Sequence, residues 1–135
     1  MFFSYNLALP ANTPKTAPVE VEALLTHGII HRVEIEFPAG CAGLVHVAVR
    51  RGLHQLWPLN PDGDLASDDW IIAWDEHQEV LEEPYAVTLT GYNLDDIYPH
   101  TPIVRIGLLP QSLQEAATRS ASLVERLAKL IGLGP

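Results

Sequence analysis

Hydrophobic and polar residues alternate at every second position through much of the chain, most clearly in THGIIHRVEIEFPAG, residues 26–40. A period of two, with many β-branched residues and Pro38 at the end, predicts a half-buried β-strand over 29–37 rather than a helix. His27 and His31 then lie about 13 Å apart along the strand, too far apart to hold one metal ion by themselves. One parity holds Ile29, His31, Val33, Ile35 and Phe37, and the other holds Arg32, Glu34 and Glu36.

The segment GLVHVAVRRG, residues 43–52, alternates in the same way. The connection PAGCAG contains the proline and glycines typical of a hairpin, so the two segments are predicted to pair antiparallel. Glu36 then lies opposite His46 on the outer side as a candidate ion pair. His31, on the apolar face, is predicted to be a hydrogen-bonded core histidine. The register that aligns the apolar faces pairs Phe37 with Val45, Ile35 with Val47 and Val33 with Val49.

Further short segments carry β-branched and aromatic residues between Pro, Gly, Asn or Asp. They are LHQLW (53–57), WIIAW (70–74), YAVTLTGY (85–92) and PIVRIGLL (102–109). Apolar residues on both parities of 70–74 predict an interior strand that is covered on both sides. Many short strands with turn signals between them predict an all-β protein, an antiparallel β-sandwich, with the jelly roll as one form of it.

The N-terminus differs from this body. Phe3, Tyr5, Leu7 and Leu9 alternate with polar positions, and the proline-rich PANTPKTAP follows. Residues 1–18 are therefore predicted to form an extended arm on a tether, next to a sandwich domain of residues 19–110. The arm either completes its own sheet or adds a strand to the edge of a neighbour.

Residues 111–135 predict one amphipathic helix, because Pro110 precedes the segment and Gly132 ends it. A helix appended to a complete sandwich must cover its apolar stripe with its own sheet or with another chain, and the pattern leaves both open. The stripe consists of Leu113, Ala116, Ala117, Leu123, Val124, Leu127, Leu130 and Ile131.

Charge narrows the classes of partner. The 135 residues fit one domain and carry a net charge of −9, and no Lys or Arg lies between Gly52 and Val104, where eleven Asp and Glu residues fall. Nucleic acids and anionic membrane surfaces need clustered Lys or Arg, so both are disfavoured as partners. No apolar run approaches the ~20 residues of a membrane span, and MFFSYNLALPA lacks the basic start of a secretory signal, so a cytoplasmic product is expected.

Two loops offer carboxylates. NPDGDLASDD, residues 60–69, contains Asp62, Asp64, Asp68 and Asp69; a solvated turn is the preferred interpretation and a Ca²⁺ site is the alternative. YNLDDIYPH, residues 92–100, could bind carbohydrate with its tyrosines and acids, although ordinary loop anchoring is preferred. The pairs Asp75/Glu76 and Glu82/Glu83 are assigned to an exposed polar connection.

Catalytic signatures are missing from the sequence. The six histidines form no His-x-His pair and no H-E-x-x-H, and there is no G-x-S-x-G elbow and no P-loop. The single cysteine, Cys41, excludes an internal disulfide and is expected to be a buried hydrophobe. A non-enzymatic protein without a cofactor is therefore predicted.

Three runs resemble a known group of proteins: THGIIHRVEIEFPAGCAGLVHVAV, HQLWPLNPDG and YPHTPIVRIGLLP. Over residues 26–110 the chain is similar to small β-sandwich accessory and decoration proteins of prokaryotic viruses and prophages. The resemblance implies a virion role and transfers no catalytic residue.

An extendable strand and an amphipathic tail are both suited to contact between chains. We therefore expect a structural protein that forms oligomers or decorates a larger particle such as a virion, with a carbohydrate- or calcium-binding module as the alternative. The predicted partner-binding residues are Phe3, Tyr5, Leu7, Leu9, Leu113, Leu123, Val124, Leu127, Leu130 and Ile131.

Overall fold

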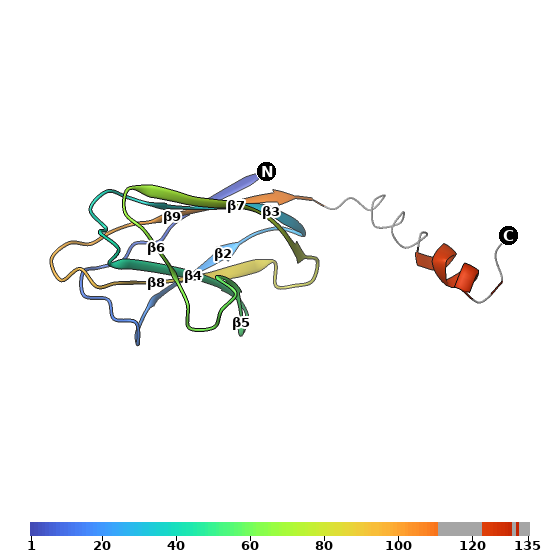
Figure 1. Cartoon of the computed structure of the whole chain (residues 1–135), viewed down its shortest axis with the longest axis horizontal. Coiled ribbons are helices and arrows are strands. Elements are labelled where there is room, and N and C mark those ends of the chain that lie inside the picture. Colours follow the sequence, from blue (N-terminus) through green and yellow to red (C-terminus); the bar gives the residue numbers. More distant parts are fainter. Residues whose placement is uncertain (111–122, 131, 133–135) are drawn as a thin grey trace.

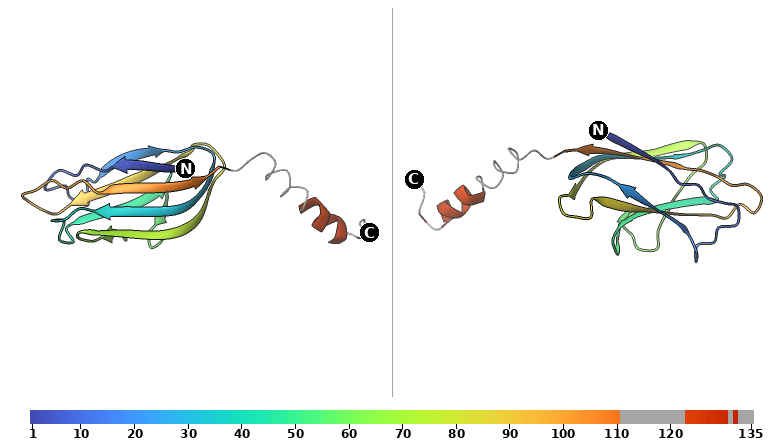
Figure 2. Two further views of the ribbon diagram at one scale, coloured as in Figure 1. Left: turned by 90° about the horizontal axis from the view of Figure 1, so that it is seen from above. Right: turned by 180° about the vertical axis from the view of Figure 1, so that it is seen from behind.

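The computed structural model describes residues 1–110, 123–130 and 132. In these residues the chain forms two antiparallel sheets that pack face to face, drawn as two layers in Figure 1 and seen from two further sides in Figure 2. The strands are β1 (Phe2–Asn6), β2 (Val19–Leu24), β3 (Gly28–Phe37), β4 (Val45–Arg51), β5 (His54–Trp57), β6 (Leu65–Ala66), β7 (Trp70–Val80), β8 (Ala86–Asn93) and β9 (Ile103–Leu109).

The strand order is that of a jelly roll. The first sheet runs β1-β9-β3-β7, and the second runs β2-β8-β4-β5 with β6 also beside β4. The pairs β1·β9, β2·β8, β3·β7 and β4·β5 form one long antiparallel ribbon, which is rolled so that successive pairs fall in alternate sheets. The predicted antiparallel β-sandwich is confirmed, and the order of its strands gives the more specific form.

The predicted hairpin between residues 29–37 and 45–51 is wrong. β3 pairs with β7 and β9, so that Phe37 lies opposite Trp70, whereas β4 pairs with β5, β6 and β8. Residues 38–44 carry the chain from one sheet to the other. Alternation shows which face of a strand is buried but not which strand lies beside it, and both strands turn their apolar faces to the same core. Glu36 accordingly meets Arg105, at 3.2 Å, and not His46.

A β-bulge changes the faces of β3. The register shifts between Ile30 and Arg32, and Ile30 is fully buried while Ile29 and His31 are only half-buried. One extra residue in the strand exchanges the two faces of the sheet for all the side chains before it. The prediction that His31 lies in the core is therefore wrong. Its ring instead packs edge-on against Phe2, with 6.1 Å between the ring centroids.

β7 is an edge strand and not the predicted interior strand. It also continues to Val80, so Asp75 and Glu76 lie in the strand and not in the exposed polar connection that the sequence predicts. Trp70 is 68% exposed and Ile71 is 44% exposed. Burial on both faces therefore does not account for the apolar composition of residues 70–74.

The N-terminus folds onto its own chain. β1 pairs with β9, and the amides of Leu7 and Leu9 donate hydrogen bonds to the carbonyls of Pro102 and His100, each at 2.9 Å. Gly91 makes room for this segment, because a Cβ at that position would lie 2.7 Å from a methyl carbon of Leu7. Of the two possibilities for residues 1–18, the structure shows the first, in which the arm completes its own sheet and its apolar residues pack in the sandwich.

Candidate functional site

Four of the predicted partner-binding residues belong to the body of the domain. Leu7 and Leu9 are fully buried, and Phe3 and Tyr5 are half-buried against the same core. The Tyr5 hydroxyl also donates a hydrogen bond to the carbonyl of Leu24 in the other sheet. These side chains hold the first strand in place and do not form a free adhesive segment.

The C-terminal helix presents a different picture. Residues 123–130 are helical, and each apolar side chain predicted there is more than half exposed. The exposed fractions are 53% for Leu123, 65% for Val124, 61% for Leu127 and 81% for Leu130. Leu113 and Ile131 lie outside the described residues. The helix is therefore the part of the predicted surface that offers apolar area to a partner.

The acidic loop at residues 60–69 uses two of its carboxylates within the fold. Asp68 accepts hydrogen bonds from the amides of Gly40 and Ala42, at 3.0 and 3.1 Å, and so ties two connections together. Asp64 lies 2.6 Å from Nδ1 of His46 and accepts a hydrogen bond from the hydroxyl of Tyr92, also at 2.6 Å. These contacts match the turn interpretation more closely than the calcium alternative.

A polar cavity of about 160 Å³ lies beside Asp64 on the outer face of the second sheet. His46 and Tyr92 stack in its wall with their rings nearly parallel, and Lys15 and Gln55 also line it. Burial opposes ionisation of Asp64, but the hydrogen bonds from Tyr92 and His46 outweigh it and lower the pKa of this carboxyl. Burial and the bond to Asp64 raise the pKa of Tyr92 to about 12. Asp64 is thus an ionised anchor for the loop.

The loop at residues 92–100 is also held by internal contacts. One oxygen of Asp95 accepts hydrogen bonds from the amides of Ile97 and Tyr98, and the other lies 2.8 Å from Nε2 of His100. The bond from His100, followed by the two amides, lowers the pKa of Asp95. The buried Asn93 adds donors to the carbonyls of Leu9 and Tyr98. These contacts give the loop the anchoring role that its sequence favours.

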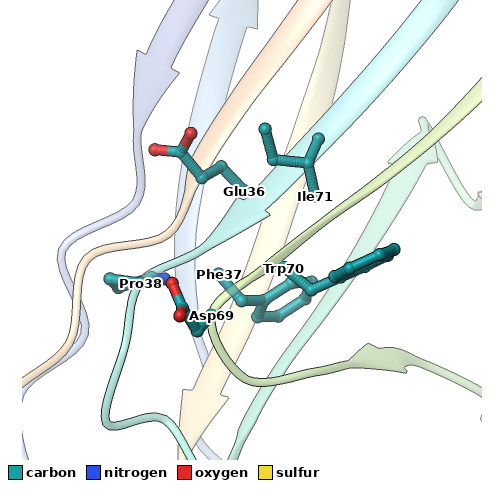
Figure 3. A pocket seen from close by; sticks show the side chains of 6 residues that line it. All are labelled: Glu36, Phe37, Pro38, Asp69, Trp70 and Ile71. Atoms are coloured by element: carbon teal, nitrogen blue, oxygen red, sulfur yellow. The ribbon is translucent and has the colours of Figure 1, made fainter.

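A larger hollow of about 490 Å³ opens at the end of β3 and the start of β7 (Figure 3). Glu36 and Phe37 at the end of β3, with Pro38 after them, line one side, and Trp70 and Ile71 at the start of β7, with Asp69 before them, line the other. In Figure 3 the Trp70 side chain extends away from Pro38 and Asp69. Sequence reasoning missed this site because it placed Trp70 inside the protein.

The described residues give little support to metal binding or to thiol chemistry. Among residues 1–110, 123–130 and 132, no three His, Cys, Asp or Glu side chains come together in a way that could hold a metal ion. Cys41 is buried, and burial, with the charges of Asp68 and Asp95, raises its pKa away from the reactive thiolate. Within the same residues, the structure contains no helix with the length and apolarity needed to cross a bilayer.

Compared with protein families and with curated proteins, the chain has no match in either.

Proposed function

We propose that this protein is a non-enzymatic structural component that associates with copies of itself, with its C-terminal helix as the main contact. The observation that carries this proposal is the exposure of Leu123, Val124, Leu127 and Leu130 on one short helix. Burial of such a side chain contributes about 1.5–3 kcal/mol, so leaving all four in water is costly for a lone molecule.

The sequence of the tail supports self-association in particular. An isolated helix of this length is marginal in water, and packing of an apolar face is what normally stabilises it. Apolar or small residues recur at alternating steps of three and four, which is the spacing of a coiled-coil seam. The seam positions are Leu113, Ala116, Ser120, Leu123, Leu127 and Leu130.

Substitution of two seam residues tests the proposal. The double variant Leu123→Asp/Leu127→Asp places charges on the exposed stripe of the full-length chain, and Glu125→Gln/Lys129→Gln is the matched control on polar positions of the same helix. Sedimentation equilibrium is expected to show loss of the oligomer in the first variant alone. An unchanged mass for both variants would show that the helix is not the contact.

A larger particle is the proposed setting. The support for it is the resemblance of residues 26–110 to virion accessory proteins, together with a compact body that leaves the helix exposed. The body of residues 1–110 carries five of the eight basic residues and fifteen of the seventeen acidic ones. A positively charged site on the particle would suit such a body.

Carbohydrate binding is a second candidate, favoured by the hollow at Trp70. An exposed indole can stack on the apolar face of a sugar ring, while carboxylates such as Glu36 and Asp69 accept hydrogen bonds from its hydroxyl groups. Titration of intrinsic fluorescence with cellotetraose and chitotetraose tests it. Saturable quenching that Trp70→Ala removes and Leu59→Ala retains supports this function, and no response to either sugar argues against it.

A further inference from the structure

The first sheet has two edges that lack the usual protection. Within the described residues, β1 and β7 each have a neighbouring strand on one side only. Unpaired backbone groups on an edge invite another chain, and natural proteins normally discourage this with charges, prolines or very short strands. β1 reads FFSYN, and the first five residues of β7 read WIIAW, with no charge and no proline in either.

The other edges of the molecule are protected. β2 carries the exposed Glu20 and Glu22, and the opposite edge of the second sheet is divided between the short strands β5 and β6. The second half of β7 carries Asp75, Glu76 and Glu79. Among the strands of the described residues, protection is therefore absent only from β1 and from residues 70–74.

Exposed apolar side chains lie at the same two places. Met1 and Phe2 are 55% and 61% exposed at one edge, and Trp70 and Ile71 are exposed at the other. Clusters of this kind on a protein surface mark contact sites. The two clusters lie on opposite edges of one sheet and toward opposite ends of its strands, because Phe2 falls in the row of Asp75 and Ile71 falls in the row of Asn6.

The strand directions allow the two edges to meet between molecules. All neighbours in the sheet are antiparallel, so β1 runs antiparallel to β7, and β1 of a second copy placed beside β7 continues the antiparallel pattern. The register forms a row across the sheet from Ser4 through Arg105 and Glu34 to Ala73. Both end residues of this row are exposed on the outer face. If a second copy pairs along this row, the core-facing sides of the two sheets lie on the same side of the joined sheet.

We propose that β7 of one copy pairs with β1 of the next, so that copies of this chain join head to tail through a continuous sheet. The contact rests on the proposed assembly role, but it is separate from the helix contact. A heterologous contact of this kind closes into a ring or continues as a filament.

Pairing of like edges is less favourable. If two copies of β7 met antiparallel about Ile72, the centre of the uncharged segment, Asp75 of each would face Asp69 of the other. Like charges directly opposite each other destabilise a strand pair. β1 contains no charged residue, so along this row it meets residues 71–75 without facing a like charge, and Asp75 lies opposite the uncharged Phe2.

Charges placed on each edge separately test the proposal. Phe2→Glu/Ser4→Glu alters β1, and Ile71→Lys/Ala73→Lys alters β7. In the folded chain the carboxylate introduced at position 4 lies opposite Arg105, and the ammonium groups introduced at positions 71 and 73 lie opposite Glu36 and Glu34, so the fold is retained. Thermal melting verifies this. Glu22→Lys on β2 is the matched control.

All variants are made in one parent protein, the full-length chain with Leu123→Asp/Leu127→Asp. These two substitutions remove the contact assigned to the helix. The molar mass is measured at protein concentrations up to about 1 mM, at which even a weak contact is populated. We expect the parent and Glu22→Lys to associate and each edge variant alone to be monomeric. A mixture of the two edge variants is expected to associate, because β7 of the first variant and β1 of the second are both unaltered.

Three outcomes would overturn the edge contact: a monomeric parent, an edge variant that still associates alone, or a mixture that stays monomeric. A monomeric parent beside an oligomeric wild-type chain would leave the helix contact standing. Association of the parent to the same extent as the wild type would remove the helix contact and keep the edge contact.

Discussion

The hydroxyl of Tyr92 donates a 2.6 Å hydrogen bond to Asp64, and the second oxygen of this carboxylate lies 2.6 Å from the ring of His46. Asp64→Asn is expected to destabilise the protein by about 1–3 kcal/mol, because it removes the charge that two half-buried partners share. Urea denaturation measures the change. Asp62→Asn, an exposed position in the same loop, serves as the control, and equal effects of the two substitutions would contradict the anchor role.

The pH dependence of stability has a definite sign. Folding lowers the pKa of Asp64 and of Asp95, so the stability that these carboxylates contribute is fully present above their unfolded values and is lost as the pH falls through the folded ones. The free energy of unfolding should therefore fall between about pH 5 and pH 2. Asp64→Asn and Asp95→Asn should each flatten this slope; a slope that neither changes would place its origin elsewhere.

Gly91 should tolerate no larger residue while the N-terminal segment is in place. An added Cβ would lie 2.7 Å from Cδ2 of Leu7 and 3.1 Å from Cδ2 of Leu9, so Gly91→Ala should destabilise the protein by about 1–3 kcal/mol. In a Leu7→Ala background the same substitution should cost less. A double-mutant cycle measures this coupling, and strictly additive effects would show that the segment does not pack there.

Much of the fold follows from the two-residue period, and the errors have identifiable causes. Alternation predicts the strands near residues 29–37, 45–51, 85–92 and 102–109, because the inner face of each is apolar. It does not show which strands are neighbours: Phe37 and Val45 lie in the same core but in opposite sheets. An inserted residue at the bulge of β3 is also invisible to it, which accounts for His31.

The candidate site was less predictable than the fold. An uncharged apolar segment such as WIIAW has the same sequence pattern whether it is a strand buried on both faces or an exposed edge strand. The arm presented the opposite problem, because its alternation allows pairing with its own sheet as well as with a neighbour. The arm packs on its own sheet because Leu7 and Leu9 fit over Gly91, which has no side chain. These residues lie more than 80 positions from Gly91 in the sequence, so the sequence pattern does not show this contact.

Calcium should have no specific effect on stability. Asp64 and Asp68 already accept hydrogen bonds from within the chain, which leaves them poorly placed to coordinate an ion. Thermal melting with millimolar Ca²⁺ should match melting with equal Mg²⁺. A bound ion at a hundred times its Kd would stabilise the protein by about 2.7 kcal/mol, so a shift of that size with Ca²⁺ alone would revive the calcium alternative.

The mass of the full-length wild-type chain in solution tests the central claim of self-association most directly. Sedimentation equilibrium over a concentration series is expected to give a multiple of 14.9 kDa that falls toward one chain on dilution. A mass of 14.9 kDa at every concentration up to about 1 mM would contradict the account.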